Sequence, residues 1–156
     1  MRGDELIVTP HPFLEGMCEQ HLRSLSQAAM RANFEEGEWI FREGEPADRF
    51  YLIQKGSVFI TSRMPAHSHI VIQTVGAGDS LGWSWLFEPY KWHFDARADE
   101  PTRALYFHAD LLRQLCQEDP KLGYELMKRV SRVVIHRLQA TRLKLLNAYA
   151  ARDLEM

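Results

Sequence analysis

One stretch in the middle of the chain has residue types that suit the binding of a small anion. It spans residues 78–87 (Gly-Asp-Ser-Leu-Gly-Trp-Ser-Trp-Leu-Phe) and continues into residues 92–98 (Trp-His-Phe-Asp-Ala-Arg-Ala). Gly78 and Gly82 allow a tight turn and the close approach of a ligand to the main chain. A short helix that begins at such a turn presents free N–H groups, which attract an anion. The pattern also fits a plain turn between strands with tryptophans in the core.

The aromatic residues of this stretch leave two interpretations open. Trp83, Trp85 and Trp92 either form a wall that stacks a planar ligand or fill the pocket themselves. His93 is a phosphate donor, a pH-sensitive group or a neutral core histidine bonded to backbone. The candidate ligand-binding residues are Leu81, Gly82, Trp83, Ser84, Trp92, His93 and Arg97.

Catalysis and metal binding are not expected. Carboxylates and hydroxyls occur near the stretch, but no spacing joins a nucleophile to a base and an orienting group. His67 and His69 have a ligand-like spacing in a polar loop, yet no other residues complete a metal site around them. Cys18 and Cys116 match neither a metal motif nor a disulfide framework, and we expect two core thiols of a cytoplasmic protein.

Composition restricts the class of protein. The chain has 156 residues, a formal net charge of −2 and 46% hydrophobic residues, which suits a single packed domain. This charge argues against a general nucleic-acid or membrane-surface binder. No apolar run reaches the roughly 18 residues of a membrane span, and the N-terminus lacks the layout of a signal peptide. We therefore expect a cytoplasmic protein with no membrane contact.

Apolar periodicity, glycines and prolines predict the elements that hold the stretch. An irregular lead-in is followed by an amphipathic helix at residues 17–31. A second helix covers residues 108–117. Short apolar runs between glycine turns favour a β-sandwich or barrel. The predicted strands are residues 39–41, 50–53, 58–61, 70–75 and 103–107.

A long C-terminal helix is predicted from Asp119, which caps its N-terminus, to about residue 149. Such a helix extends beyond a small β core, so its outer apolar face needs a partner, and a C2 homodimer supplies one. Arg137 and Lys144 interrupt that face and suggest polar contacts. The apolar face comprises Leu122, Leu126, Met127, Val130, Val133, Val134, Leu138 and Leu145. The opposite, basic face comprises Lys121, Lys128, Arg129, Arg132, His136 and Arg142.

The chain resembles the cyclic nucleotide-binding domain of Crp/Fnr-type regulators and cyclic-nucleotide-dependent kinases. The motif is residues 37–48 (Gly-Glu-Trp-Ile-Phe-Arg-Glu-Gly-Glu-Pro-Ala-Asp), with residues 50–56 and the Gly78-Asp79 and Leu81-Gly82 pairs. The resemblance implies an α+β, mainly β fold: a double-stranded β-helix or jelly-roll β-roll flanked by an N-terminal helix and two C-terminal helices. We divide the chain into a lead-in (1–16), the β-roll with flanking helices (17–118) and a dimerising helix (119–156).

The resemblance breaks down at the ligand contacts. The family's ribose-binding Glu follows the cassette glycine, where this chain has Trp83. The family's phosphate-binding Arg and the small residue after it fall on Trp92 and His93. An indole cannot replace the charged fork that an Arg offers an anion. Lys91 and Arg97 are the nearby cations. The ligand is therefore open: cAMP, cGMP or another nucleotide.

Two functions follow from the resemblance. The first is a stand-alone sensor or regulatory domain that binds a nucleotide or similar small anion and acts on a separate protein. The second is a ligand-free interaction module whose pocket is filled by aromatic rings. The family's transcription factors carry a helix-turn-helix after the long helix. This sequence ends at Met156, so we expect no direct DNA binding.

Overall fold

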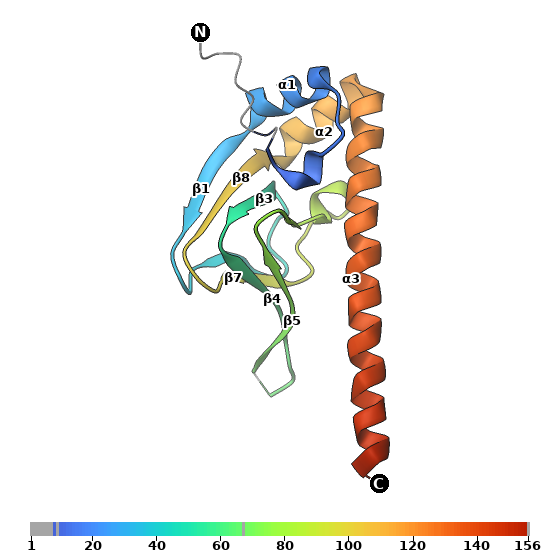
Figure 1. Ribbon diagram of the computed structural model, residues 1–156. Helices are drawn as coiled ribbons and strands as arrows, with labels where there is room; N and C mark the ends of the chain where they lie inside the picture. The colour runs from blue at the N-terminus through green and yellow to red at the C-terminus, as the bar shows by residue number, and fades with distance from the viewer. Residues whose placement is uncertain (1–7, 9, 67, 156) are drawn as a thin grey trace.

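Two antiparallel sheets form a β-roll in the computed structural model, which describes residues 8, 10–66 and 68–155 (Figure 1). Within these residues, eight strands divide equally into the orders β1-β8-β3-β6 and β2-β7-β4-β5. The jelly-roll expectation is thereby confirmed. The strands are β1 (Met30–Phe34), β2 (Trp39–Phe41), β3 (Arg49–Lys55), β4 (Ser57–Arg63), β5 (His69–Gly76), β6 (Ser80–Leu81), β7 (Asp95–Ala98) and β8 (Thr102–His108).

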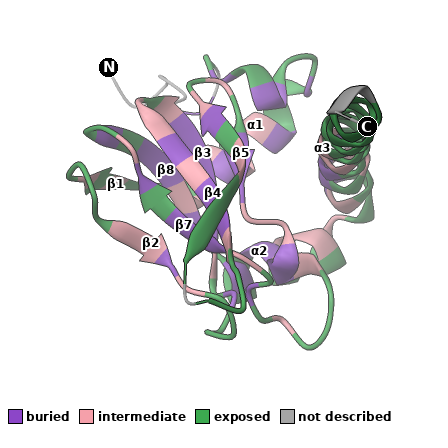
Figure 2. Ribbon diagram, turned by 90° about the horizontal axis from the view of Figure 1, so that it is seen from below, coloured by how far each residue is buried: buried purple, intermediate pink, exposed green. Residues whose placement is uncertain are grey.

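Alternation along β3 produces two hydrophobic cores. Phe50 and Leu52 face one core, beneath the helices, whereas Tyr51 and Ile53 face the other, inside the roll. Successive strand side chains point to opposite faces, so a strand buried on both faces serves both cores. Figure 2 shows the buried positions on β3 and β8. The core inside the roll contains Trp92 and thereby adjoins the candidate stretch.

The described roll is flanked by three α-helices: α1 (Glu19–Ala28) and α2 (Ala109–Glu118) cover one end of it, and α3 (Pro120–Glu155) starts at that end and runs along the side. The Asp119 carboxylate accepts a hydrogen bond from the Leu122 N–H at 3.3 Å, as expected of a capping residue. The first helix ends earlier than predicted because residues 30–34 pair with β8 as strand β1. In the lead-in, Pro12–Leu14 forms a 3₁₀ turn, η2, and buries Phe13 and Leu14 in the core.

The two halves of α3 have different surroundings. Leu122, Leu126 and Val130 are buried against the roll and the other helices. Beyond them the helix runs along the side of the roll, and residues 138–153 are exposed throughout (Figures 1 and 2). The prediction that the far half extends beyond the core is confirmed.

The two cysteines and one arginine differ in burial from what the sequence suggested. Cys18 is exposed rather than a core thiol, and Cys116 is half-buried. Arg129 is buried rather than on the solvated basic face: its guanidinium pairs with Glu125 and donates to the Glu15 carbonyl at 2.8 Å. His67, expected in a polar loop, lies outside the described residues.

Candidate functional site

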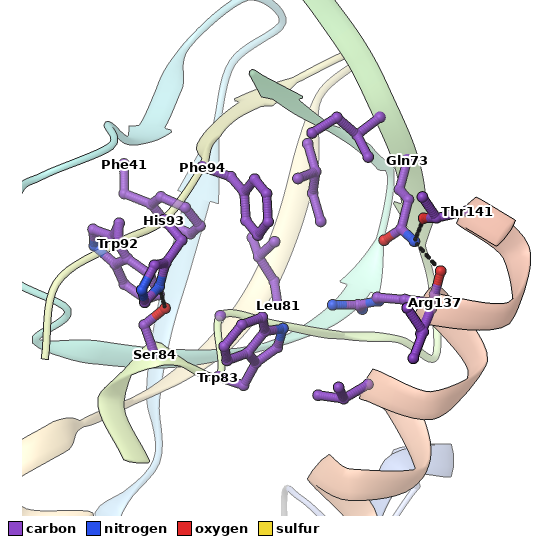
Figure 3. A pocket seen from close by; sticks show the side chains of 15 residues that line it. Phe41, Gln73, Leu81, Trp83, Ser84, Trp92, His93, Phe94, Arg137 and Thr141 are labelled. Carbon is purple, nitrogen blue, oxygen red and sulfur yellow. Dashed lines mark hydrogen bonds between the residues drawn. The ribbon is translucent and has the colours of Figure 1, made fainter. Parts of the chain in front are cut away.

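A pocket of about 370 Å³ lies between the β-roll and α3 (Figure 3). The candidate stretch supplies its floor, β5 supplies one side, and α3 closes the other. Of the seven candidate residues, six line it. The full lining is Phe41, Ile60, Ile72, Gln73, Leu81, Gly82, Trp83, Ser84, Trp92, His93, Phe94, Val134, Arg137, Leu138 and Thr141.

Trp92 occupies the space directly above Gly82. Its ring is 4% exposed and stacks on Phe41, with the ring centroids 3.8 Å apart and the planes at 9°. Gly82 has φ +89°, and a Cβ added there would lie 2.6 Å from the Trp92 ring. The indole therefore fills the approach to this glycine that the sequence had suggested for an anion.

The other residues of the stretch separate into two groups. Trp83 is half-buried at the pocket wall and stacks with His93, with the two ring centroids 5.9 Å apart. The Ser84 hydroxyl and His93 Nδ1 are hydrogen-bonded at 3.1 Å. Trp85 instead lies fully buried in the core beneath the helices, beside Phe50. Of the three tryptophans, Trp83 and Trp92 line the pocket and Trp85 does not.

Arg97 lies outside the pocket. It alternates along β7 with Ala96 and Ala98, which are fully buried, so its side chain points outward and is exposed. Its guanidinium instead lies 5.6 Å from the Trp39 ring. Lys91, the other cation considered, is also exposed and does not line the pocket. Neither cation replaces the missing phosphate contact.

The pocket's cation comes from α3. Arg137 donates to the Ser80 carbonyl, and Lys144 donates to the Ile72 carbonyl at 2.7 Å, so both residues make the polar contacts that their positions suggested. Burial lowers the pKa of Arg137 below its usual range, and Asp79 opposes this effect. None of the described residues places a carboxylate within 4.0 Å of Arg137.

Gln73 was not identified from the sequence. Its amide on β5 donates to the Arg137 carbonyl at 3.0 Å and to the Thr141 hydroxyl at 3.4 Å. β5 is an edge strand, so its side chains and carbonyls are available to a helix that packs alongside. The sequence feature that could have identified Gln73 is its polar side chain among the β-branched residues of this strand.

Comparison with known proteins identifies the fold's family. The model of the cyclic nucleotide-binding domain matches residues 31–119, which is more than half of the chain. The chain belongs to this family. Its β-roll is thus the cyclic nucleotide-binding fold.

Related proteins agree with this assignment. A CRP-like cAMP-activated global transcriptional regulator from Mycobacterium tuberculosis is 28% identical over 138 residues, which are 88% of this chain and 59% of the relative. The chain therefore spans less than two thirds of that regulator. A cAMP-dependent protein kinase regulatory subunit from Dictyostelium discoideum is 44% identical over 46 residues, or 30% of this chain and 14% of the subunit.

Solved structures show the same fold. A cyclic nucleotide-binding domain from Methylobacillus flagellatus KT has a TM-score of 0.77 and 23% identity, with 85% of this chain and 74% of that chain covered. A putative cyclic nucleotide-binding protein from Geobacter metallireducens GS-15 has a TM-score of 0.72 and 28% identity, with 81% of this chain and 91% of that chain covered.

Among the residues that the structure describes, no helix is long and apolar enough to cross a membrane.

Proposed function

We propose that this domain is a non-catalytic cytoplasmic sensor that binds a small anionic ligand between its β-roll and α3 and regulates a separate protein. The observation that carries the proposal is the pocket of about 370 Å³, which lies within the usual size range of ligand sites. Membership of the cyclic nucleotide-binding family supports a nucleotide or a similar anion as the ligand.

Helix α3 connects the pocket to the outside of the domain. Val134, Arg137, Leu138 and Thr141 contribute to the pocket wall from this helix. The same helix continues into an exposed segment that is available to a partner. A ligand in the pocket shifts the position of α3 only if it binds one arrangement of the helix more tightly than another. We propose that this helix transmits occupancy.

The second candidate function is a ligand-free interaction module. It is favoured by Trp92, which packs against Phe41 and Gly82 and occupies space that an anion would use. The open volume beside Trp83 argues for the sensor instead, because a pocket filled by its own side chains would not leave it. We therefore rank the sensor first.

A thermal-shift titration tests the sensor. We expect a ligand from a panel of cAMP, cGMP, cyclic and linear dinucleotides and small aromatic acids to raise the melting temperature by roughly 5–10 °C at a hundred times its Kd. Leu138→Trp places an indole ring at the pocket wall, from an exposed position, and should abolish the shift. Absence of any shift, with a stable heteromeric complex in its place, would establish the interaction module.

We also propose a homodimer through α3. Ile135, Leu138, Leu145 and Tyr149 are each more than half exposed. With Arg142 between them they follow the alternating three- and four-residue spacing of a coiled-coil seam. Exposed apolar residues aligned along one helix favour burial against a second copy.

Leu145→Glu should convert the dimer to a monomer, since it places two like charges at the proposed seam. Size-exclusion chromatography with light scattering measures the mass directly. Asn147→Glu, an exposed position on the side of the same helix that faces away from this seam, should leave the mass unchanged. A wild-type protein that is monomeric at high concentration would refute the dimer.

A further inference from the structure

The pocket has an apolar side and a polar side. The roll contributes apolar and aromatic groups, among them Leu81, Trp83 and Phe94. Polar side chains gather on the opposite side, where Arg137 and Thr141 project from α3 and Gln73 faces them from β5 (Figure 3). A ligand that matches this pocket therefore has one apolar face and one polar end.

The Ser84 hydroxyl on the roll side already has a partner. The Ser84 hydroxyl and the His93 ring are hydrogen-bonded to each other at 3.1 Å. Trp92 covers the backbone at Gly82 and, as an indole, contributes one N–H and no charge. A ribose with a cyclic phosphate would place several polar groups against this largely apolar side, where few partners are present.

Arg137 is the cation that an anionic group would meet. The guanidinium has five N–H donors, and the contact recorded for its side chain is to the Ser80 carbonyl. Its charge lacks a carboxylate partner within 4.0 Å among the residues that the structure describes. Arg binds carboxylates in a planar, bidentate manner, so an acid at this end supplies the missing charge.

We infer that the ligand is a planar aromatic acid, with its ring against Trp83 and Phe94 and its anionic group on Arg137. This inference rests on the proposed ligand-binding function and specifies its ligand class. A pocket of about 370 Å³ is at the small end for ligand sites and suits one or two fused rings. The exposed part of the Trp83 indole provides the stacking surface for such a ring.

Matched pairs of probes test the inference by isothermal titration calorimetry. Benzoate, 2-naphthoate and indole-3-acetate are each compared with their primary amides, which keep the ring but remove the charge. We expect at least one acid to bind about ten- to a hundredfold more tightly than its amide, as one charge-assisted contact predicts. Trp83→Ala should weaken acid and amide alike.

Substitutions in α3 test whether Arg137 makes the charged contact with the acid. Arg137→Gln should bring the acid-to-amide affinity ratio close to one, and Arg137→Lys should keep part of the preference. Arg132→Gln removes an exposed cation from the same helix and should leave the ratio unchanged. Because Arg137 also contacts Ser80, circular dichroism establishes that each variant is folded before titration.

The outcomes separate the ligand class from the function. If cAMP or a dinucleotide binds in the pocket and all three acids fail, the aromatic acid is refuted while the sensor stands. If neither the acids nor the nucleotides bind, both proposals fail. Equal binding of acid and amide, or an unchanged ratio in Arg137→Gln, refutes the role of Arg137.

Discussion

Trp92→Ala is expected to lower the free energy of unfolding by about 3–5 kcal/mol, the range for removing a large aromatic side chain from a core. The indole is 4% exposed, stacks on Phe41 and contacts Gly82, so its removal leaves a cavity between β2 and the turn before η3 (Ser84–Leu86). Urea unfolding followed by circular dichroism measures the change.

Phe87→Ala provides the control for Trp92→Ala. Phe87 is an aromatic residue of the same stretch but is 47% exposed, so its loss should cost much less. If Trp92→Ala changes stability by less than about 1 kcal/mol but abolishes ligand binding, Trp92 is a ligand wall rather than core. This result would reverse the structural role that we assign to it.

Gly82→Ala is expected to cost about 2–5 kcal/mol for two separable reasons. A left-handed backbone costs a non-glycine residue about 1–2 kcal/mol, and an added methyl group in a packed core costs about 1–3 kcal/mol. The new Cβ would lie 2.6 Å from two atoms of the Trp92 ring, so the ring must move. Thermal or urea unfolding reports the total.

Gly37→Ala separates the two contributions. Gly37 has φ +85°, close to the +89° of Gly82, but a Cβ there would meet no atom within 4 Å. Its substitution should therefore cost only the backbone part, about 1–2 kcal/mol. In a Trp92→Phe background the smaller ring should reduce the cost of Gly82→Ala. Equal costs for the two alanines would show that the ring yields freely and that the contact does not constrain the turn.

The sequence predicted the fold because its strongest patterns are local. Glycine turns between β-branched runs determined the positions of β3, β4 and β5, and the Asp119 cap determined the start of α3. The boundary near residue 30 was missed, since residues 30–34 carry helix-compatible side chains and become a strand only through pairing with β8. Pairing of this kind depends on residues more than 60 positions away.

The pocket was less predictable because its contacts cross between elements. Strand alternation gives Arg97 no fixed direction until β7 is known to begin at Asp95. The overlap of Trp92 with Gly82 depends on how a loop folds back over a turn, which spacing does not encode. Arg137 was found as an interruption of an apolar face, whereas its acceptor, the Ser80 carbonyl, became apparent only in the structure.

Helix α3 is held to the rest of the protein more strongly in its first turns than in its later turns. Its first turns are held by buried Leu122, Leu126 and Val130, whereas its later turns contact the roll through Arg137, Thr141 and Lys144. Local opening costs least where few apolar contacts are lost. Opening of the outer turns is therefore expected to cost less than opening of the first turns. A ligand or second copy that adds contacts at Leu138 is therefore expected to raise the cost of opening these turns.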